Sequence, residues 1–231
     1  MLDKEKEQKI LVIEHLLMPE ENNIALTLSF FYKDFTEKYG GADKELLDYS
    51  RVQMEHSHLF QTPDGMKNIR DALNDLNLQK DEYSEIVLDV LYSKDRYGFG
   101  SNRYMSDLFT RLLGIKSSDS VMDIGSGKGN FLAFVASAFQ KETIRPSLFG
   151  IEIDLDSYFI SKMALTLCDA NFKIAKVNAL SKTEIPSFTK GFVFPPFGIY
   201  TSQIYSQSFN HLQTELFNTR TSAEWLFVFK A

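Results

Sequence analysis

The sequence predicts an α/β protein in which an N-terminal α-helical domain is followed by a parallel, doubly wound sheet. Apolar residues recur at helical spacing before residue 95, and short apolar strands alternate with helices after residue 114. The charge is also divided: residues 1–95 carry −9 and residues 96–231 carry +3, in a chain of 231 residues with net charge −6. We therefore expect a helical domain over 1–95 and a second domain over 96–231 with a different function.

The first part should contain five helices, which we expect at 4–18, 23–39, 43–58, 62–76 and 81–93. Pro19 ends the first of them, and Gly40 stops the second. The fourth has a strong start signal, with Thr62 as a hydroxyl cap, Pro63 at the first helical position and Asp64 in the first turn. No strand-like alternation interrupts this pattern, so the whole part is predicted to be helical.

The second part alternates between the two kinds of element. A helix capped by Ser101 or Asn102 should run to Leu113. Strands are expected at 121–124, 148–153, 172–177 and 191–194, with helices at 130–140 and 156–167 between them. Strands joined through helices by short links predict a parallel sheet.

Composition excludes several classes of function. Cys168 is the only cysteine, which rules out an intramolecular disulfide and a cysteine-based zinc site, and the four His lack metal-ligand spacing, so we expect no metal. No stretch approaches 18 apolar residues and the first residues do not open a signal peptide, so we expect a cytoplasmic protein without a membrane partner. The pI of about 5.3 indicates that any contact with nucleic acid is local or is supplied by a partner.

The sharpest motif follows the first strand, where Gly125, Gly127 and Gly129 are spaced by single residues. Glycines let the chain turn tightly and let a ligand approach the backbone closely. Asn130 stands where the dinucleotide fingerprint has its third glycine, and no Gly-Lys-Ser/Thr follows for a triphosphate loop. Asp123, at the strand end, would suit a cationic ligand. The alternative is an ordinary tight turn.

Two further features lie at the ends of later strands. Glu152 ends the second strand, where a carboxylate can accept both hydroxyl hydrogens of a ribose. After the fourth strand come Phe194, Pro195, Pro196 and Phe197. The two prolines stiffen the chain and leave carbonyls free to accept from a substrate, and the last ring could stack on a base. The alternative is a rigid turn from strand to loop.

In this order the motifs resemble those of class I S-adenosylmethionine-dependent methyltransferases. Among these, the sequence is most similar to amino-methylating DNA adenine methylases, and specifically to the modification subunit of type I restriction-modification systems. The resemblance spans roughly residues 74–231 and includes 99–102 at the position of the family's Phe-Tyr-Thr-Pro element. It implies a Rossmann-like methyltransferase sheet and S-adenosylmethionine as cofactor.

The resemblance also implies roles for individual positions. Asp123, Gly125 and Gly127 would line the methionine half of the cofactor, and Ser101 would contact its carboxylate. Glu152 would hold its ribose, and Asn178 would lie near its adenine amine. The catalytic loop would consist of Phe194, Pro195, Pro196 and Phe197. That loop normally begins with Asn or Asp, whose oxygen accepts from the target amine, and Phe194 has no such acceptor. Such a group is commonly worth about 2–4 kcal/mol.

The resemblance further implies a seven-stranded domain, of which four strands are expected here, so we expect a C-terminally truncated domain. The function expected is a DNA adenine-N6 methyltransferase of the restriction-modification type, acting on a flipped base. It would meet DNA through partner subunits, namely specificity and restriction subunits. Two alternatives stay open: a catalytically silent cofactor-binding or interaction module, and a methyltransferase acting on RNA or protein.

Overall fold

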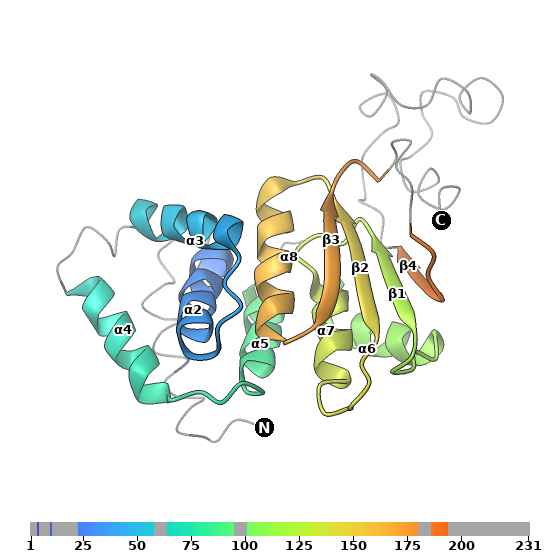
Figure 1. Ribbon diagram of the computed structural model, residues 1–231, viewed down its shortest axis with the longest axis horizontal. Helices are drawn as coiled ribbons and strands as arrows, with labels where there is room; N and C mark the ends of the chain where they lie inside the picture. Colours follow the sequence, from blue (N-terminus) through green and yellow to red (C-terminus); the bar gives the residue numbers. More distant parts are fainter. Residues whose placement is uncertain are drawn as a thin grey trace.

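The computed structural model describes Lys4, Ile10 and residues 23–57, 64–94, 101–179 and 186–193. The helical half contains α2 (Asn23–Tyr39), α3 (Lys44–His56), α4 (Gly65–Leu76) and α5 (Tyr83–Lys94). The second half runs through α6 (Arg103–Leu112), β1 (Ser120–Ile124), α7 (Asn130–Ala138), β2 (Ser147–Glu152), α8 (Leu155–Leu167), β3 (Asn171–Lys176) and β4 (Lys190–Val193) (Figure 1). The predicted fold class is confirmed: a helical region precedes a parallel sheet with helices, as in Rossmann-like methyltransferases.

Helices α3 and α6 begin where a side chain accepts from free backbone N–H groups. The Asp43 carboxylate caps α3 by accepting from the N–H groups two and three residues later, at 2.8 and 3.4 Å. Asn102 caps α6 in the same way, which decides between it and Ser101. The start of α4 differs from the prediction, because Asp64 is its N-cap residue rather than part of the first turn. Residues 62–63 lie outside the described part of the chain.

The four strands are parallel and lie in the order β3-β2-β1-β4. This register places Asp123 of β1 beside Gly150 of β2 and Phe192 of β4. Glu152, the last residue of β2, lies beside Lys176, the last residue of β3. Since parallel strands end at the same edge of a sheet, the acidic strand ends and the glycine turn meet along one edge.

Strand side chains alternate between two faces of the sheet. On one face, Phe192 stacks on Phe131 of α7, with 4.1 Å between ring centroids, and meets Phe109 of α6 at 5.1 Å. A smaller cluster of buried side chains lies apart from this main core, namely Met122, Ile124, Ile151 and Ala179. The main core therefore covers the face of the sheet that Phe192 occupies, and the smaller cluster lies on the other face.

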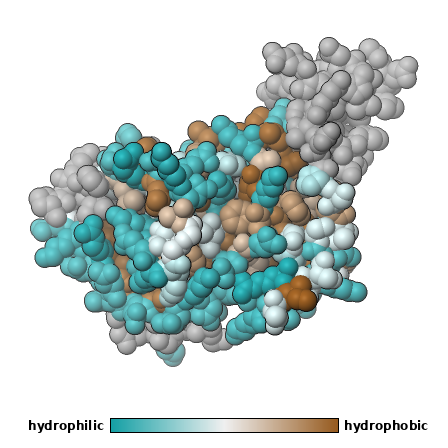
Figure 2. Space-filling model, viewed as in Figure 1, coloured by the Kyte–Doolittle hydropathy of each residue, from teal (hydrophilic) through white to brown (hydrophobic). Residues whose placement is uncertain are grey.

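The helical half packs directly against the second half. Helices α2 and α3 contact α8, and α5 contacts α7 and α8, as Figure 1 shows. Apart from this smaller cluster, the buried apolar side chains of both halves form one continuous cluster. In Figure 2, hydrophilic side chains cover most of the visible helical half, and apolar side chains gather over the strands. The two halves thus differ in net charge, but within the described residues they pack against each other without a gap.

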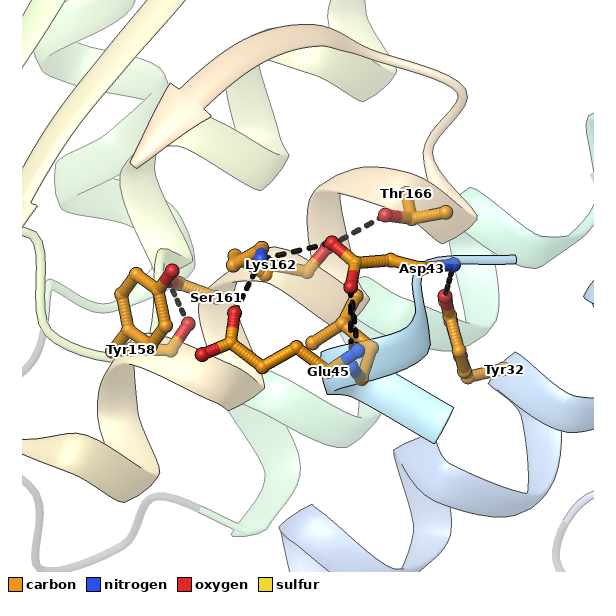
Figure 3. Close-up of polar contacts among 8 residues, drawn as sticks. Tyr32, Asp43, Glu45, Tyr158, Ser161, Lys162 and Thr166 are labelled. Atoms are coloured by element: carbon orange, nitrogen blue, oxygen red, sulfur yellow. Dashed lines mark hydrogen bonds and ion pairs between the residues drawn. The ribbon is translucent and has the colours of Figure 1, made fainter. Parts of the chain in front are cut away.

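A charged cluster joins α8 to the start of α3 (Figure 3). The ammonium of Lys162 lies 3.0 Å from a carboxylate oxygen of Asp43 and 3.2 Å from one of Glu45. It also lies 5.3 Å from the ring centroid of Tyr158. Burial would lower the pKa of Lys162, but its hydrogen bonds to the two carboxylates outweigh burial and raise that pKa. The cluster ties α8 to the helical half through a cation that is mostly shielded from water.

Candidate functional site

The turn between β1 and α7 is tied to the end of β2. The backbone N–H groups of Gly125 and Ser126 both donate to the carbonyl oxygen of Ile151, at 3.0 and 2.9 Å. Gly125 and Gly127 have positive φ values of 80° and 54°, which glycine adopts without steric cost. A Cβ added at Gly127 would meet nothing within 4 Å. The turn therefore leaves open space beside the backbone of Gly127, where a ligand could approach.

Two other glycines are needed for close packing behind the turn. A Cβ at Gly129, whose φ is 82°, would lie 2.9 Å from the Cβ of Ser161 on α8. A Cβ at Gly150 in β2 would lie 3.0 Å from the hydroxyl oxygen of Ser126 and closer still to Ile174. Gly150 belongs to none of the predicted site motifs, although an isolated glycine inside a strand is a signal of close approach. These contacts hold the turn against both β2 and α8.

Glu152 is buried and already accepts three hydrogen bonds from the backbone. One carboxylate oxygen accepts from the N–H groups of Ile153 and Asp154, both at 2.7 Å. The other accepts from the N–H of Gly127 at 2.7 Å. A carboxylate offers about four acceptor positions, so about one remains for a ligand hydroxyl. A pair of ribose hydroxyls would require one of these backbone bonds to open.

Asp123 is the electrostatic anomaly of the site. Its side chain is 2% exposed, and its Oδ1 has no hydrogen-bond partner. Burial, and to a lesser extent the negative charge of Glu152, raise the pKa of Asp123 to about 8. A buried carboxylate without a partner is costly unless a cation or a donor approaches it. A positively charged ligand would therefore stabilise the ionised form of Asp123.

Ser101 and Asn178 come from two other segments of the chain, one before α6 and one after β3. Ser101 is buried, and its carbonyl oxygen accepts a hydrogen bond from the side-chain amide of Asn130, at 3.3 Å, where α7 begins. Asn178 follows β3, one residue after Val177, whose N–H donates to the carbonyl of Glu152 at 3.0 Å. The structure thus places Ser101 near the start of α7 and Asn178 near the ends of β2 and β3.

Of the predicted site residues, Asp123, Gly125, Gly127 and Glu152 lie around one turn. The predicted catalytic loop, Phe194, Pro195, Pro196 and Phe197, lies outside the described residues. The last described residue of β4, Val193, pairs with Ile124 of β1, so β4 ends next to the strand that carries Asp123. Within the described residues there is no group of three His, Cys, Asp or Glu that could hold a metal ion.

A parallel sheet with a glycine turn after its first strand, and with acidic residues ending its first two strands, has the architecture of class I S-adenosylmethionine-dependent methyltransferases. Residues 98–231 match the model of the N-6 DNA methylase family. This match covers more than half of the chain, and the chain belongs to that family. No curated protein matches the chain.

Comparison with solved structures supports the fold. The chain resembles a Listeria monocytogenes protein assigned to the class I S-adenosylmethionine-dependent methyltransferases, with a TM-score of 0.58 and 13% identity over 99% of this chain and 69% of that one. Weaker matches are a dimethyladenosine transferase from Plasmodium falciparum (TM-score 0.35, 25% identity, 46% and 36% covered) and a coclaurine N-methyltransferase bound to N-methylheliamine and SAH (0.38, 13%, 80% and 54%).

Family membership implies the use of S-adenosylmethionine, and the described residues fit this cofactor. The partnerless oxygen of Asp123 offers an acceptor to a cationic group. The open space at Gly127 lets a ligand contact the backbone. The remaining acceptor position of Glu152 suits a hydroxyl.

No helix within the described residues is both long and apolar enough to cross a membrane.

Proposed function

We propose that this chain is an S-adenosylmethionine-dependent DNA adenine-N6 methyltransferase of the modification-subunit type found in restriction-modification systems. The observation that carries the proposal is the family match, because it covers the same residues that build the glycine turn and the acidic strand ends. We further propose that it works in the cytoplasm and meets DNA through specificity and restriction subunits. The −9 balance of residues 1–95 favours partner-assisted binding.

When bound, S-adenosylmethionine supplies an electrophilic methyl group on a sulfonium. The task of the protein is then to align this methyl group with the target amine and to exclude water. Asp123 would offset the positive charge of the cofactor, Glu152 would hold one ribose hydroxyl, and the backbone around Gly127 would accommodate the ligand at close range. Loss of the methyl group would turn the sulfonium into a neutral thioether, which needs no proton, so the residues of this chain would act mainly by binding and aligning the reactants.

Under this proposal, Phe194 lowers the rate of methyl transfer but does not change the type of reaction. The family match does not favour the alternative of a silent module, and nothing described here favours RNA or protein as substrate. The missing oxygen acceptor should lower the rate by a factor of about 10² to 10³ relative to an Asn at this position. A tritiated-methyl transfer assay on adenine-containing DNA should therefore give low activity for the native chain and higher activity for Phe194→Asn.

Isothermal titration with S-adenosylmethionine tests the cofactor site directly. Gly127→Ala should weaken binding by about tenfold or more, because its Cβ would occupy ligand space. Gly114→Ala is the matched control: Gly114 has a φ of 56° against 54° for Gly127, and its Cβ would also meet nothing within 4 Å. Both variants carry the same backbone strain. Equal affinities in the two variants, or no heat from the folded native chain, would overturn the proposed site.

A further inference from the structure

Helix α6 exposes a stripe of large apolar side chains. Tyr104, Leu108 and Leu112 follow one another at intervals of four residues, and their exposed fractions are 86%, 48% and 69%. Side chains four residues apart lie on the same face of a helix. Within the described part of the chain, no other helix exposes three large apolar side chains. Patches of this kind mark surfaces that another molecule covers.

The opposite face of α6 is held in the core, so the stripe faces outward. Ser106 is buried, and the ring of Phe109 meets that of Phe192 on β4, with 5.1 Å between centroids. The helix also packs on α7. In Figure 1, α6 lies on the side of the sheet away from α2, α3 and α4, so these three helices leave its outer face uncovered.

Opposite charges border the stripe along one flank. Asp107 and Arg111 each directly precede a residue of the stripe, so they lie one turn apart on the same flank of the helix. Their side chains are 44% and 78% exposed, and they pair within the helix at 3.0 Å. This flank therefore presents a negative charge followed by a positive one.

A second copy of the helix fits this surface when it runs in the opposite direction. In a two-fold symmetric pair the two charged flanks then lie on the same edge of the contact, whereas in a parallel pair they lie on opposite edges. One register sets Asp107 opposite Arg111 of the second copy, and symmetry repeats this ion pair. The same register places Leu108 about 3 Å along the axis from both Leu108 and Leu112 of the second copy, so the apolar side chains interleave.

We propose that the face of α6 formed by Tyr104, Leu108 and Leu112 is an interface with a second copy of this chain, paired antiparallel through α6. The inference goes beyond the proposed function and does not depend on it. Stable protein interfaces bury about 800 Å² per partner, and three side chains on one helix supply less than this. We therefore expect a reversible dimer that forms at micromolar or higher concentration.

Sedimentation equilibrium of the full chain over a range of concentrations measures this association. The native chain should shift from monomer to dimer. Leu108→Glu should raise the dissociation constant of the dimer at least about tenfold, because two like charges would meet at the centre of the contact. Val52→Glu is the control, since Val52 is 42% exposed, close to the 48% of Leu108, but lies on α3. It should leave the association unchanged.

A charge exchange tests the antiparallel register. Asp107→Arg and Arg111→Asp should each associate at least about tenfold more weakly than the native chain, because each variant sets like charges opposite each other. An equimolar mixture of the two variants should recover the dimer. Every pair across the contact is then opposite in charge, although each helix keeps like charges within itself.

Three results would overturn the inference: a native chain that stays monomeric, a dimer that Leu108→Glu and Val52→Glu weaken equally, or a mixture of the two charge variants that fails to associate. If residues 194–231 of the same chain cover the stripe instead, the native chain should be monomeric and Leu108→Glu should lower its resistance to urea. That outcome would also overturn the inference.

Discussion

Replacing Asp123 with Asn should change how the stability of the protein depends on pH. The pKa of this buried carboxyl is raised from its ordinary 3.8 to about 8, chiefly by burial. Between these values the folded chain keeps a proton that the unfolded chain releases. Because the folded state then binds more protons, its stability falls as the pH rises through this window. The loss is absent below about pH 4 and complete above about pH 8.

The magnitude follows from the same shift. Each pH unit within the window costs the folded state about 1.4 kcal/mol. The cost relative to an ordinary aspartate should therefore reach about 4 kcal/mol at pH 7, three units above the unfolded pKa. Asn cannot titrate, so Asp123→Asn removes the slope. The buried amide would lack partners and cost about 1–3 kcal/mol at every pH, so the test is the slope and not the absolute difference.

Urea unfolding of the native chain and of Asp123→Asn at pH 5, 6, 7 and 8 measures this difference. The variant should gain on the native chain by about 1.4 kcal/mol per pH unit. Asp119→Asn is the control, because hydrogen bonds from Lys116 and Thr189 lower the pKa of Asp119. Asp119 therefore stabilises above its ordinary pKa, and its removal should give a constant offset from pH 5 to 8. Parallel curves for the native chain and Asp123→Asn would refute the reasoning.

The same substitution should also change how the affinity for the cofactor depends on pH, with the opposite sign to the effect on stability. A cationic ligand favours the ionised carboxylate, so binding of S-adenosylmethionine to the native chain should release a proton and strengthen from pH 6 to 8. Asp123→Asn should abolish this pH dependence and weaken binding. Calorimetry in two buffers of different ionisation enthalpy detects the released proton. A pH-independent affinity of the native chain would contradict this role of Asp123.

Two other substitutions test the packing that supports the site. Gly129→Ala should destabilise the protein by about 2–4 kcal/mol, since its Cβ would press on Ser161 at a positive φ. Adding Ser161→Gly should restore part of this loss. Thermal unfolding that shows no change in Gly129→Ala would argue against the close contact. Lys162→Met should cost about 1 kcal/mol, because the cation is 14% exposed and serves two carboxylates. Lys33→Met, which removes an exposed pair at 4.0 Å, should cost less in the same urea titration.

Much of the fold could be predicted because its signals are local. The helix over Asn23–Tyr39 and the end of α4 at Leu76 agree with the sequence prediction to the residue. Strand positions agree within about one residue, because short apolar runs between turn residues mark them. The glycine turn and Glu152 were predicted for the same reason, since strand ends and glycine spacing involve residues close in the chain.

Properties that depend on residues distant in the sequence required the tertiary structure. The sequence left Asn102 and Ser101 as alternative caps of α6; the structure uses Asn102, and the carbonyl oxygen of Ser101 accepts from Asn130, 29 positions away. The raised pKa of Asp123 comes chiefly from its burial between β2 and β4, and the need for Gly150 comes from the side chains of Ile174 in β3 and Ser126 in the turn. Sequence spacing specifies which elements form, because periodicity and capping act within a few residues. Burial and hydrogen-bond partners are decided only when the elements pack. For this reason, no sequence pattern indicated that the hydroxyl of Tyr92 contacts Ser106 and the carbonyl oxygen of Asn130.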